Sequence, residues 1–194
     1  MKKLTIAVDC DDVLIDSTAF VVAAYNARYA TNVKLENAFV SANPEWGVDR
    51  PEVFRRLHEI YGSDEFRRLE PRADARASIA NLAQNHTLHL VTARDLVLEL
   101  VTLQMLDIFF PKCFYDINHV GEGSKGSICV ALNADMLVDD NAKHLRDALD
   151  CGVEHAVWFG EYPWQTHDLS DSNLGNRYKG WHEVEREVNR VAKR

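Results

Sequence analysis

The chain has 194 residues, enough for one well-filled domain or for one domain that carries an inserted subdomain. Its net charge of −8 argues against a nucleic-acid polymer or an anionic membrane as a non-specific partner. Its apolar runs are far shorter than the roughly 18 residues that a membrane span requires, so we expect no membrane partner. The four cysteines are scattered and form no CxxC pair, which favours reduced thiols and a cytoplasmic location.

The first element of the chain is the stretch at residues 3–17, KLTIAVDCDDVLIDS. Its apolar run at residues 4–8 predicts a buried parallel strand, and the acids Asp9, Asp11 and Asp12 follow at the C-terminal end. Open α/β sheets bind their ligands at that end. Three acids in four residues repel one another unless a cation or a shared proton relieves them.

Residues 16–72 carry helical patterns and no convincing strand. Val21, Tyr25 and Tyr29 repeat at the spacing of one helix face, and Pro51 fits the first turn of another helix. We therefore predict a small helical cap subdomain at residues 16–72. It is inserted into a core domain formed by residues 1–15 and 73–194.

After residue 72, helical and strand patterns alternate, with strands predicted at residues 87–91, 113–117, 136–138 and 156–159. This alternation predicts an α/β fold, a Rossmann-like doubly wound parallel sheet with helices on both faces and right-handed crossovers. We expect a polar loop at residues 160–179, before a final helix. This loop follows the last strand on the ligand side and either borders the pocket or is an ordinary surface loop.

Polar residues follow four of the predicted strands. In a parallel sheet these strand ends share one edge, so residues distant in sequence converge there. Each residue alone has an ordinary structural alternative, such as a helix cap for paired acids or a solvated first-turn position for a lysine. Together they offer oxygen ligands for Mg²⁺, a cation and a hydroxyl, which are the parts that phosphoryl transfer uses. The residues are Asp9, Asp11, Thr92, Lys125, Asp139 and Asp140.

These motifs, DxDxV, a Thr after the second strand, a helix-starting Lys and a final DD, resemble the haloacid dehalogenase superfamily of aspartate-nucleophile phosphatases. DCDDVL, FRRLEP at residues 66–71 and GWHEV at residues 180–184 more narrowly resemble the 5'(3')-deoxyribonucleotidases. Two departures stand out. Asp12 occupies a position where many members have Gly, and Thr92-Ala93-Arg94 replaces a Thr-Ser-Pro segment, which removes one phosphate-contacting hydroxyl.

The resemblance implies that Asp9 attacks phosphorus and forms an aspartyl-phosphate, which water then hydrolyses. Asp11 would protonate the leaving oxygen and later deprotonate water. Mg²⁺ would be held by the Asp9 side chain, the Asp11 backbone carbonyl and Asp140. Asp139 would lie either in the outer shell or directly on the metal.

The resemblance also implies that Thr92 and Lys125 grip the phosphoryl oxygens, with help from the backbone amide of Ala93. The helical cap would cover the site and select the substrate. Trp46 and Phe66 are our candidates for stacking on a planar base, although both could instead pack the core of the insertion.

The sequence thus predicts a Mg²⁺-dependent phosphomonoesterase that acts on a small phosphate ester, first of all a nucleoside monophosphate. A sugar phosphate is the nearest alternative substrate. A dehalogenase would use the same nucleophile but no metal and no second acid, so Asp11 and the pair Asp139-Asp140 argue against it. Two alternatives of a different class remain, a phospho-accepting signalling domain and a purely binding protein. The sequence predicts no oligomeric state.

Overall fold

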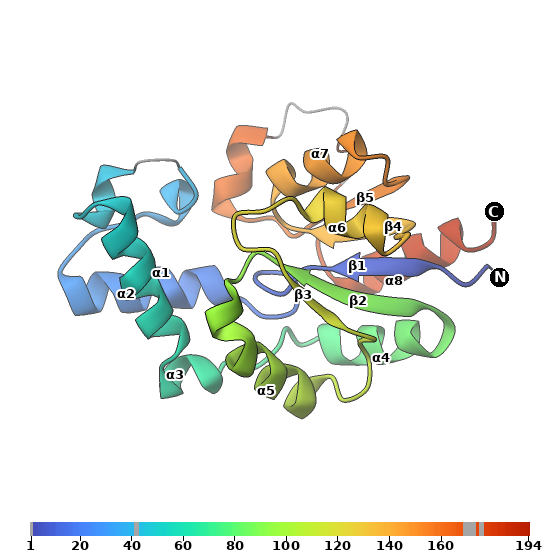
Figure 1. Ribbon diagram of the computed structural model, residues 1–194, viewed down its shortest axis with the longest axis horizontal. Coiled ribbons are helices and arrows are strands. Elements are labelled where there is room, and N and C mark those ends of the chain that lie inside the picture. Colours follow the sequence, from blue (N-terminus) through green and yellow to red (C-terminus); the bar gives the residue numbers. More distant parts are fainter. Residues whose placement is uncertain (1, 41–42, 169–173, 175–176) are drawn as a thin grey trace.

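The computed structural model describes residues 2–40, 43–168, 174 and 177–194. At its centre lies a six-stranded parallel sheet with the strand order β3-β2-β1-β4-β5-β6 (Figure 1). The strands are β1 (Thr5–Val8), β2 (Thr87–Thr92), β3 (Ile117–His119), β4 (Met136–Asp139), β5 (His155–Phe159) and β6 (Arg177–Tyr178). The predicted α/β class with a doubly wound parallel sheet is confirmed.

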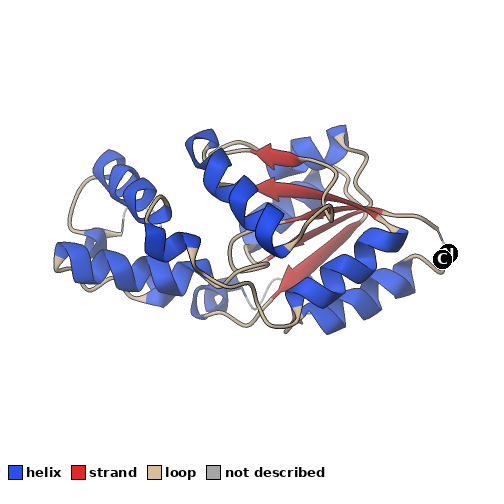
Figure 2. Ribbon diagram, turned by 90° about the horizontal axis from the view of Figure 1, so that it is seen from below, coloured by secondary structure: helices blue, strands red, loops and turns tan. Residues whose placement is uncertain are grey.

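Helices cover both faces of the sheet (Figure 2). Along the chain they are α1 (Ser17–Tyr29), α2 (Arg50–Tyr61), α3 (Asp64–Arg67), α4 (Ala75–Asn85), α5 (Glu99–Phe109), α6 (Lys125–Ala131), α7 (Ala142–Asp150) and α8 (Trp181–Val191). Short 3₁₀ helices are η1 (Leu35–Asn37), η2 (Pro44–Trp46), η3 (Leu96–Leu98) and η4 (Pro163–Asp168). Among the described helices, none combines the length and the apolar character that crossing a bilayer requires.

The two faces of the sheet have separate apolar cores, because successive strand residues point to opposite sides. Ile6 and Val8 of β1 pack with residues of α4 and α8 and the end of α5, whereas Ala7 packs with α6 and α7. Both faces of β1 are therefore buried, which explains why its sequence is a continuous apolar run rather than an alternating one.

All regular elements described between Ser17 and Arg67 are helices, and they have an apolar core of their own that includes Val21, Tyr25 and Ile60. This helical segment leaves and re-enters the sheet domain at one place. Ile15 bridges to both Asp11 and Pro71, and the Arg72 N–H donates to Leu14 O at 2.9 Å. The segment lies beyond the carboxyl ends of the strands, away from both chain termini (Figure 1).

Two sequence predictions need correction. The third strand was expected at residues 113–117, but the regular ladder with β2 begins only at Ile117 and runs to His119. Tyr115 and Asp116 still hydrogen-bond to β2, without forming a continuous ladder. The expected polar loop at residues 160–179 contains η4 and the edge strand β6, while its residues 169–173 and 175–176 lie outside the described part of the chain.

The strand register sets the position of the polar residues. Val8 pairs with Leu90 of β2 on one side and with Val138 of β4 on the other. Asp9 therefore follows β1 level with Asp139, the last residue of β4, and Thr92 ends β2 one residue further along. The strand order changes direction between β1 and β4, the place where open α/β sheets form their ligand crevice.

The first turn of α8 ties the C-terminal helix to the loop after β1. The fully buried Trp181 donates from its indole N–H to Val13 O at 2.8 Å. In Trp181→Phe this carbonyl loses its partner inside the core, so we expect the free energy of unfolding to fall by about 2 kcal/mol in urea denaturation. Val97→Ala, at a side chain that is 71% exposed, is the control and should change it by less than about 0.5 kcal/mol. Equal effects of the two variants would contradict this assignment.

Candidate active site

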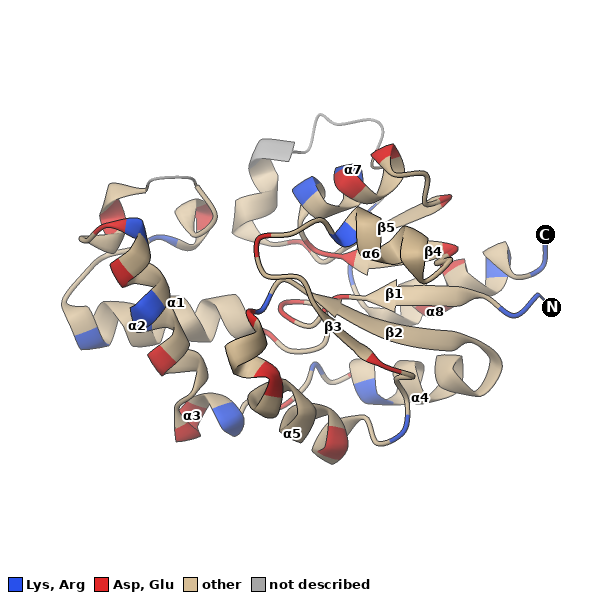
Figure 3. Ribbon diagram, in the orientation of Figure 1, with Lys and Arg blue, Asp and Glu red and all other residues tan. Residues whose placement is uncertain are grey.

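Three buried acids meet where β1 and β4 end. Asp9, Asp139 and Asp140 each offer a carboxylate oxygen, and these oxygens all lie within 4.8 Å of one another. Figure 3 shows the acidic stretches at the ends of β1 and β4 that face the helical segment. The structure thus brings together the acids that the sequence places at separate strand ends.

Lys125 is the cation inside this cluster. It is fully buried, and its Nζ lies 2.7 Å from Asp9 Oδ1 and 2.7 Å from Asp139 Oδ2. Both distances suit charge-assisted hydrogen bonds from the ammonium to a carboxylate, so Lys125 links the end of β1 to the end of β4.

Local structure fixes Lys125 at the start of α6. The preceding Ser124 caps the helix by accepting a hydrogen bond from the Ser127 N–H at 2.9 Å. Asp147 of α7 accepts hydrogen bonds from the Ser124 hydroxyl and from the Gly126 N–H. Position 126 has room only for glycine, because a Cβ there would lie 2.4 Å from Asp147 O. The close contact of α6 and α7 thus aims the lysine at the acids.

Burial makes the charged forms of these acids costly. It raises the pKa of Asp9 to about 6, although Lys125 acts in the opposite direction. It raises the pKa of Asp139 as well, again against Lys125, and it raises the pKa of Asp140 well above its usual value, with further contributions from neighbouring acids. One lysine does not offset this negative charge. A buried cluster of three carboxylates whose oxygens lie within 4.8 Å of one another, with surplus negative charge, fits a divalent cation such as Mg²⁺.

Residues of β5 and of the segment after it hold Asp140 in place. The Trp164 indole N–H donates to Asp140 Oδ2 at 2.8 Å, and the Asp140 carbonyl accepts from Trp158 at 3.0 Å and from the Gln165 amide at 2.8 Å. The segment after the last strand therefore borders the acid cluster. Of the two possibilities for the loop at residues 160–179, the structure thus shows that Trp164 and Gln165 border the cluster, and neither residue type is a motif that predicts this. The signal available in the sequence was the position of the segment after a strand on the ligand side.

Asp12 has a structural role next to the cluster. Its backbone adopts φ +59°, the left-handed conformation that favours glycine, which accounts for the Gly found here in the resembling family. Its side chain accepts hydrogen bonds from the backbone N–H and the hydroxyl of Thr18 in the first turn of α1. Burial raises the pKa of Asp12 to about 8. Asp12 thus anchors the helical segment to the loop after β1, which glycine could not do through a side chain.

Asp11 points to a different partner from Asp9. Its two carboxylate oxygens accept hydrogen bonds from Arg94 Nε and Nη2, each at 2.8 Å. Burial raises the pKa of Asp11, but Arg94 more than offsets this, so the pKa lies below its usual value. Arg94 appeared in the sequence analysis only as part of a departure from a family motif, and its position two residues after Thr92 was the signal that could have identified it.

The remaining predicted residues divide into two groups. Thr92 and Ala93 lie at the end of β2 beside the acids; the Thr92 hydroxyl is buried and accepts the Arg94 N–H at 3.2 Å, whereas Ala93 is exposed. Trp46 and Phe66 belong to the core of the helical segment. Trp46 packs edge-on against Tyr25, and Phe66 also faces Arg94, with 5.3 Å between the ring centre and the guanidinium carbon.

Comparison with known proteins identifies the family. The family model described as 5' nucleotidase, deoxy (pyrimidine), cytosolic type C protein matches residues 2–194. The chain belongs to this family. The match spans the sheet domain and the helical segment together, and it makes the protein a phosphoric monoester hydrolase of the haloacid dehalogenase superfamily, as its motifs predicted. No curated protein sequence matches the chain.

Solved structures share the fold at low sequence identity. A haloacid dehalogenase-like hydrolase from Streptococcus pneumoniae has a TM-score of 0.68 at 13% identity, with 96% of this chain and 98% of that chain covered. A putative β-phosphoglucomutase from Thermotoga maritima has a TM-score of 0.67 at 16% identity, covering 98% and 100%. A magnesium-bound putative hydrolase from Bacillus subtilis has a TM-score of 0.62 at 16% identity, covering 97% and 100%.

The raised pKa of Asp9 has a consequence for stability. Because its folded-state pKa of about 6 exceeds the ordinary value of 3.8, ionising Asp9 between about pH 4 and pH 6 destabilises the fold. Asp9→Asn removes this cost, so with EDTA at pH 7.5 we expect its Tm to exceed that of the wild type by several degrees. The gain should shrink as the pH falls toward 4.

Thermal unfolding across this pH range, monitored by circular dichroism, measures the effect. Asp107→Asn, at an exposed position on α5, is the matched control and should leave Tm unchanged. A lower Tm for Asp9→Asn at pH 7.5 would show that Asp9 stabilises the fold and is not under electrostatic strain.

Proposed function

We propose that the protein is a Mg²⁺-dependent phosphomonoesterase that hydrolyses nucleoside monophosphates through an aspartyl-phosphate on Asp9. The observation that carries the proposal is the state of Asp9. It is buried at the carboxyl edge of the sheet, with its Oδ1 2.7 Å from the ammonium of Lys125 and with oxygens of Asp139 and Asp140 within 4.8 Å. A carboxylate held in this way can attack a phosphorus atom once its charge and that of the phosphate are balanced.

In the first step, an Asp9 oxygen bonds to phosphorus and the bond from phosphorus to the ester oxygen breaks. Asp11 gives the leaving oxygen its proton. In the second step, water attacks the same phosphorus, Asp11 accepts a proton from that water, and the Asp9 carboxylate is released with inorganic phosphate. The nucleophile and the acid are two residues apart on one strand end, which places them on the same side of the chain.

The phosphoryl group carries negative charge throughout both steps. Lys125 is positioned to neutralise it next to the nucleophile, and the Thr92 hydroxyl and the Ala93 backbone amide offer hydrogen bonds from β2. Asp9, Asp140 and the Asp11 carbonyl would hold Mg²⁺, with Asp139 as a direct or outer ligand. When bound, the metal supplies the positive charge that lets an anionic nucleophile approach an anionic phosphate.

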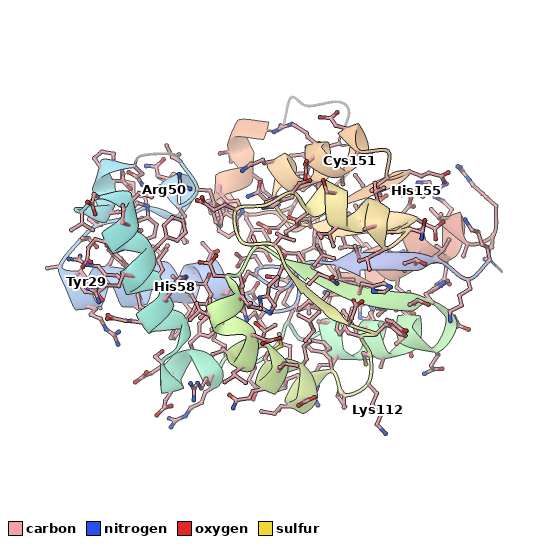
Figure 4. All side chains as sticks on the ribbon, viewed as in Figure 1. Tyr29, Arg50, His58, Lys112, Cys151 and His155 are labelled. Carbon is pink, nitrogen blue, oxygen red and sulfur yellow. The ribbon has the colours of Figure 1, made fainter. Side chains whose placement is uncertain are left out.

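We propose that residues 16–72 act as a cap over this site, on a core made of residues 1–15 and 73–194. Contacts between side chains join the two parts, and three of them lie along the side of the cap that faces the core. Arg50 pairs with Glu122, His58 lies 2.8 Å from Asp95, and the rings of Phe39 and Trp164 meet edge-on at 5.4 Å. Figure 4 shows Arg50 and His58 on the side of α2 that faces the core. A cap held in this way excludes water from the reacting groups.

The cap also supplies the residues for substrate selection. Phe66 lies next to Arg94 at the catalytic edge, and we propose that it contacts the base of a nucleotide. Trp46 lies further inside the cap core against Tyr25, where it would act by holding the shape of the cap rather than by direct stacking. The family is named for a cytosolic nucleotidase, and we propose the same compartment, in which free thiols such as the four cysteines of this chain remain reduced.

Phosphate release from a panel of monophosphates tests the proposal. The panel contains 5'- and 3'-nucleotides in ribo and deoxy forms and sugar phosphates, each with Mg²⁺ and with EDTA. We expect release only with Mg²⁺ and fastest from nucleotides, and a loss of roughly 10³-fold or more in kcat for Asp9→Asn. Faster release from sugar phosphates would refute the nucleotide pocket, whereas full activity in EDTA would refute the metal.

A further inference from the structure

Arg94 is the charged residue at the site that the two-step mechanism leaves without a task. It follows the phosphate-binding segment at Thr92 and Ala93, and its side chain is 2% exposed. Its fork of N–H groups grips both oxygens of Asp11 at 2.8 Å, and its Nη1 donates to the Thr102 hydroxyl at 3.1 Å. A buried guanidinium thus engages both oxygens of Asp11, the carboxyl group that the mechanism uses as its acid.

This pairing is incompatible with proton donation by Asp11. A general acid needs its proton within about 2.6–3.2 Å of the leaving oxygen. A carboxylate that accepts two N–H groups from a guanidinium is held as the anion, and both of its oxygens are engaged. Arg94 must therefore loosen its hold on Asp11 before the ester bond breaks.

The incoming ester provides the alternative partner. Arginine's planar fork matches two phosphoryl oxygens as well as it matches a carboxylate, and the phosphoryl group carries more charge. Because Asp11 has to reach the oxygen attached to phosphorus, a guanidinium 2.8 Å from Asp11 is close to the phosphoryl oxygens as well. Resting on the proposed function, we propose that Arg94 is a second phosphoryl-binding cation that pairs with Asp11 in the free protein and transfers to the phosphoryl oxygens when the ester binds.

The helical segment takes part in this exchange. The rings of Tyr61 on α2 and Phe66 on α3 lie 5.5 and 5.3 Å from the Arg94 guanidinium carbon. Aromatic faces attract a cation, most strongly where water is excluded. These rings keep the guanidinium in contact with the cap while its anionic partner changes, so the cap residues and the phosphoryl group meet at the same side chain.

Binding of inorganic phosphate in the presence of Mg²⁺, measured by isothermal titration calorimetry, tests the proposal without turnover. Asp11→Asn removes the competing carboxylate, so it should bind phosphate more tightly than the wild type. Adding Arg94→Met should then weaken binding by about 30-fold, the size expected for charge-assisted hydrogen bonds. Adding Arg94→Lys instead should recover part of that loss. The double variant with Arg94→Met lacks both charges of the pair, and the one with Arg94→Lys keeps only the cation. Neither leaves a charged Asp11 without a partner.

Arg76→Met in the Asp11→Asn background controls for net charge. Arg76 lies on α4 and contacts Phe109, and its removal should change phosphate affinity by less than 2-fold. Equal phosphate affinity of Asp11→Asn with and without Arg94→Met would overturn the proposal and leave Arg94 as a structural partner of Asp11. If the wild-type protein still hydrolysed esters of the panel, the proposed function would stand even though the role of Arg94 had failed. Wild type that neither binds phosphate nor hydrolyses any ester would overturn both.

Discussion

The structure depends on one buried lysine among acids. Lys125 lies between Asp9 and Asp139, and further acids follow on both strand ends. Removing the lysine would leave Asp9 and Asp139 buried without their cation, a loss that typically costs about 3–5 kcal/mol. Removing Asp9 instead leaves Lys125 paired with Asp139. The elements that position this lysine, from the Ser124 cap to the close contact of α6 with α7, are therefore as necessary to the site as the acids themselves. The charge that remains unbalanced is what makes the cluster suitable for a cation and a phosphate.

The parallel sheet makes such a cluster predictable from sequence. Each of its residues stands directly after an apolar strand, and parallel strands bring these positions to one edge whatever their distance along the chain. Asp9, Thr92 and Asp139 follow this rule, and Lys125 follows it through the helix that comes after β3. The helical segment was also predictable, because its apolar residues recur at helical spacing. Pro51 and Ser63 also mark the starts of two of its helices.

Other features depend on contacts that local patterns do not contain. The ladder of β3 uses Ile117, Asn118 and His119 at a partly exposed sheet edge, whereas the apolar signal lay earlier, at Cys113, Phe114 and Tyr115. The hold of Arg94 on Asp11 joins residues 83 positions apart, and the contact of Trp164 with Asp140 comes from a segment that reads as an ordinary polar loop. Asp12 lies between these two cases. Its position next to the acids is visible in the sequence, whereas its left-handed backbone and its contact with Thr18 are visible only in the structure.

The central claim is that Asp9 is the nucleophile, and trapping its phosphorylated form tests this claim most directly. Borohydride reduces an acyl phosphate to an alcohol with loss of phosphate, which converts the aspartate into homoserine. In samples quenched during turnover with Mg²⁺ and a nucleoside monophosphate, peptide mass spectrometry should find homoserine at position 9. Protein that turns over substrate but receives no borohydride should retain aspartate there, and so should protein treated with borohydride in the absence of substrate. Phosphate release with position 9 unmodified, or with homoserine at another acid, would contradict the account.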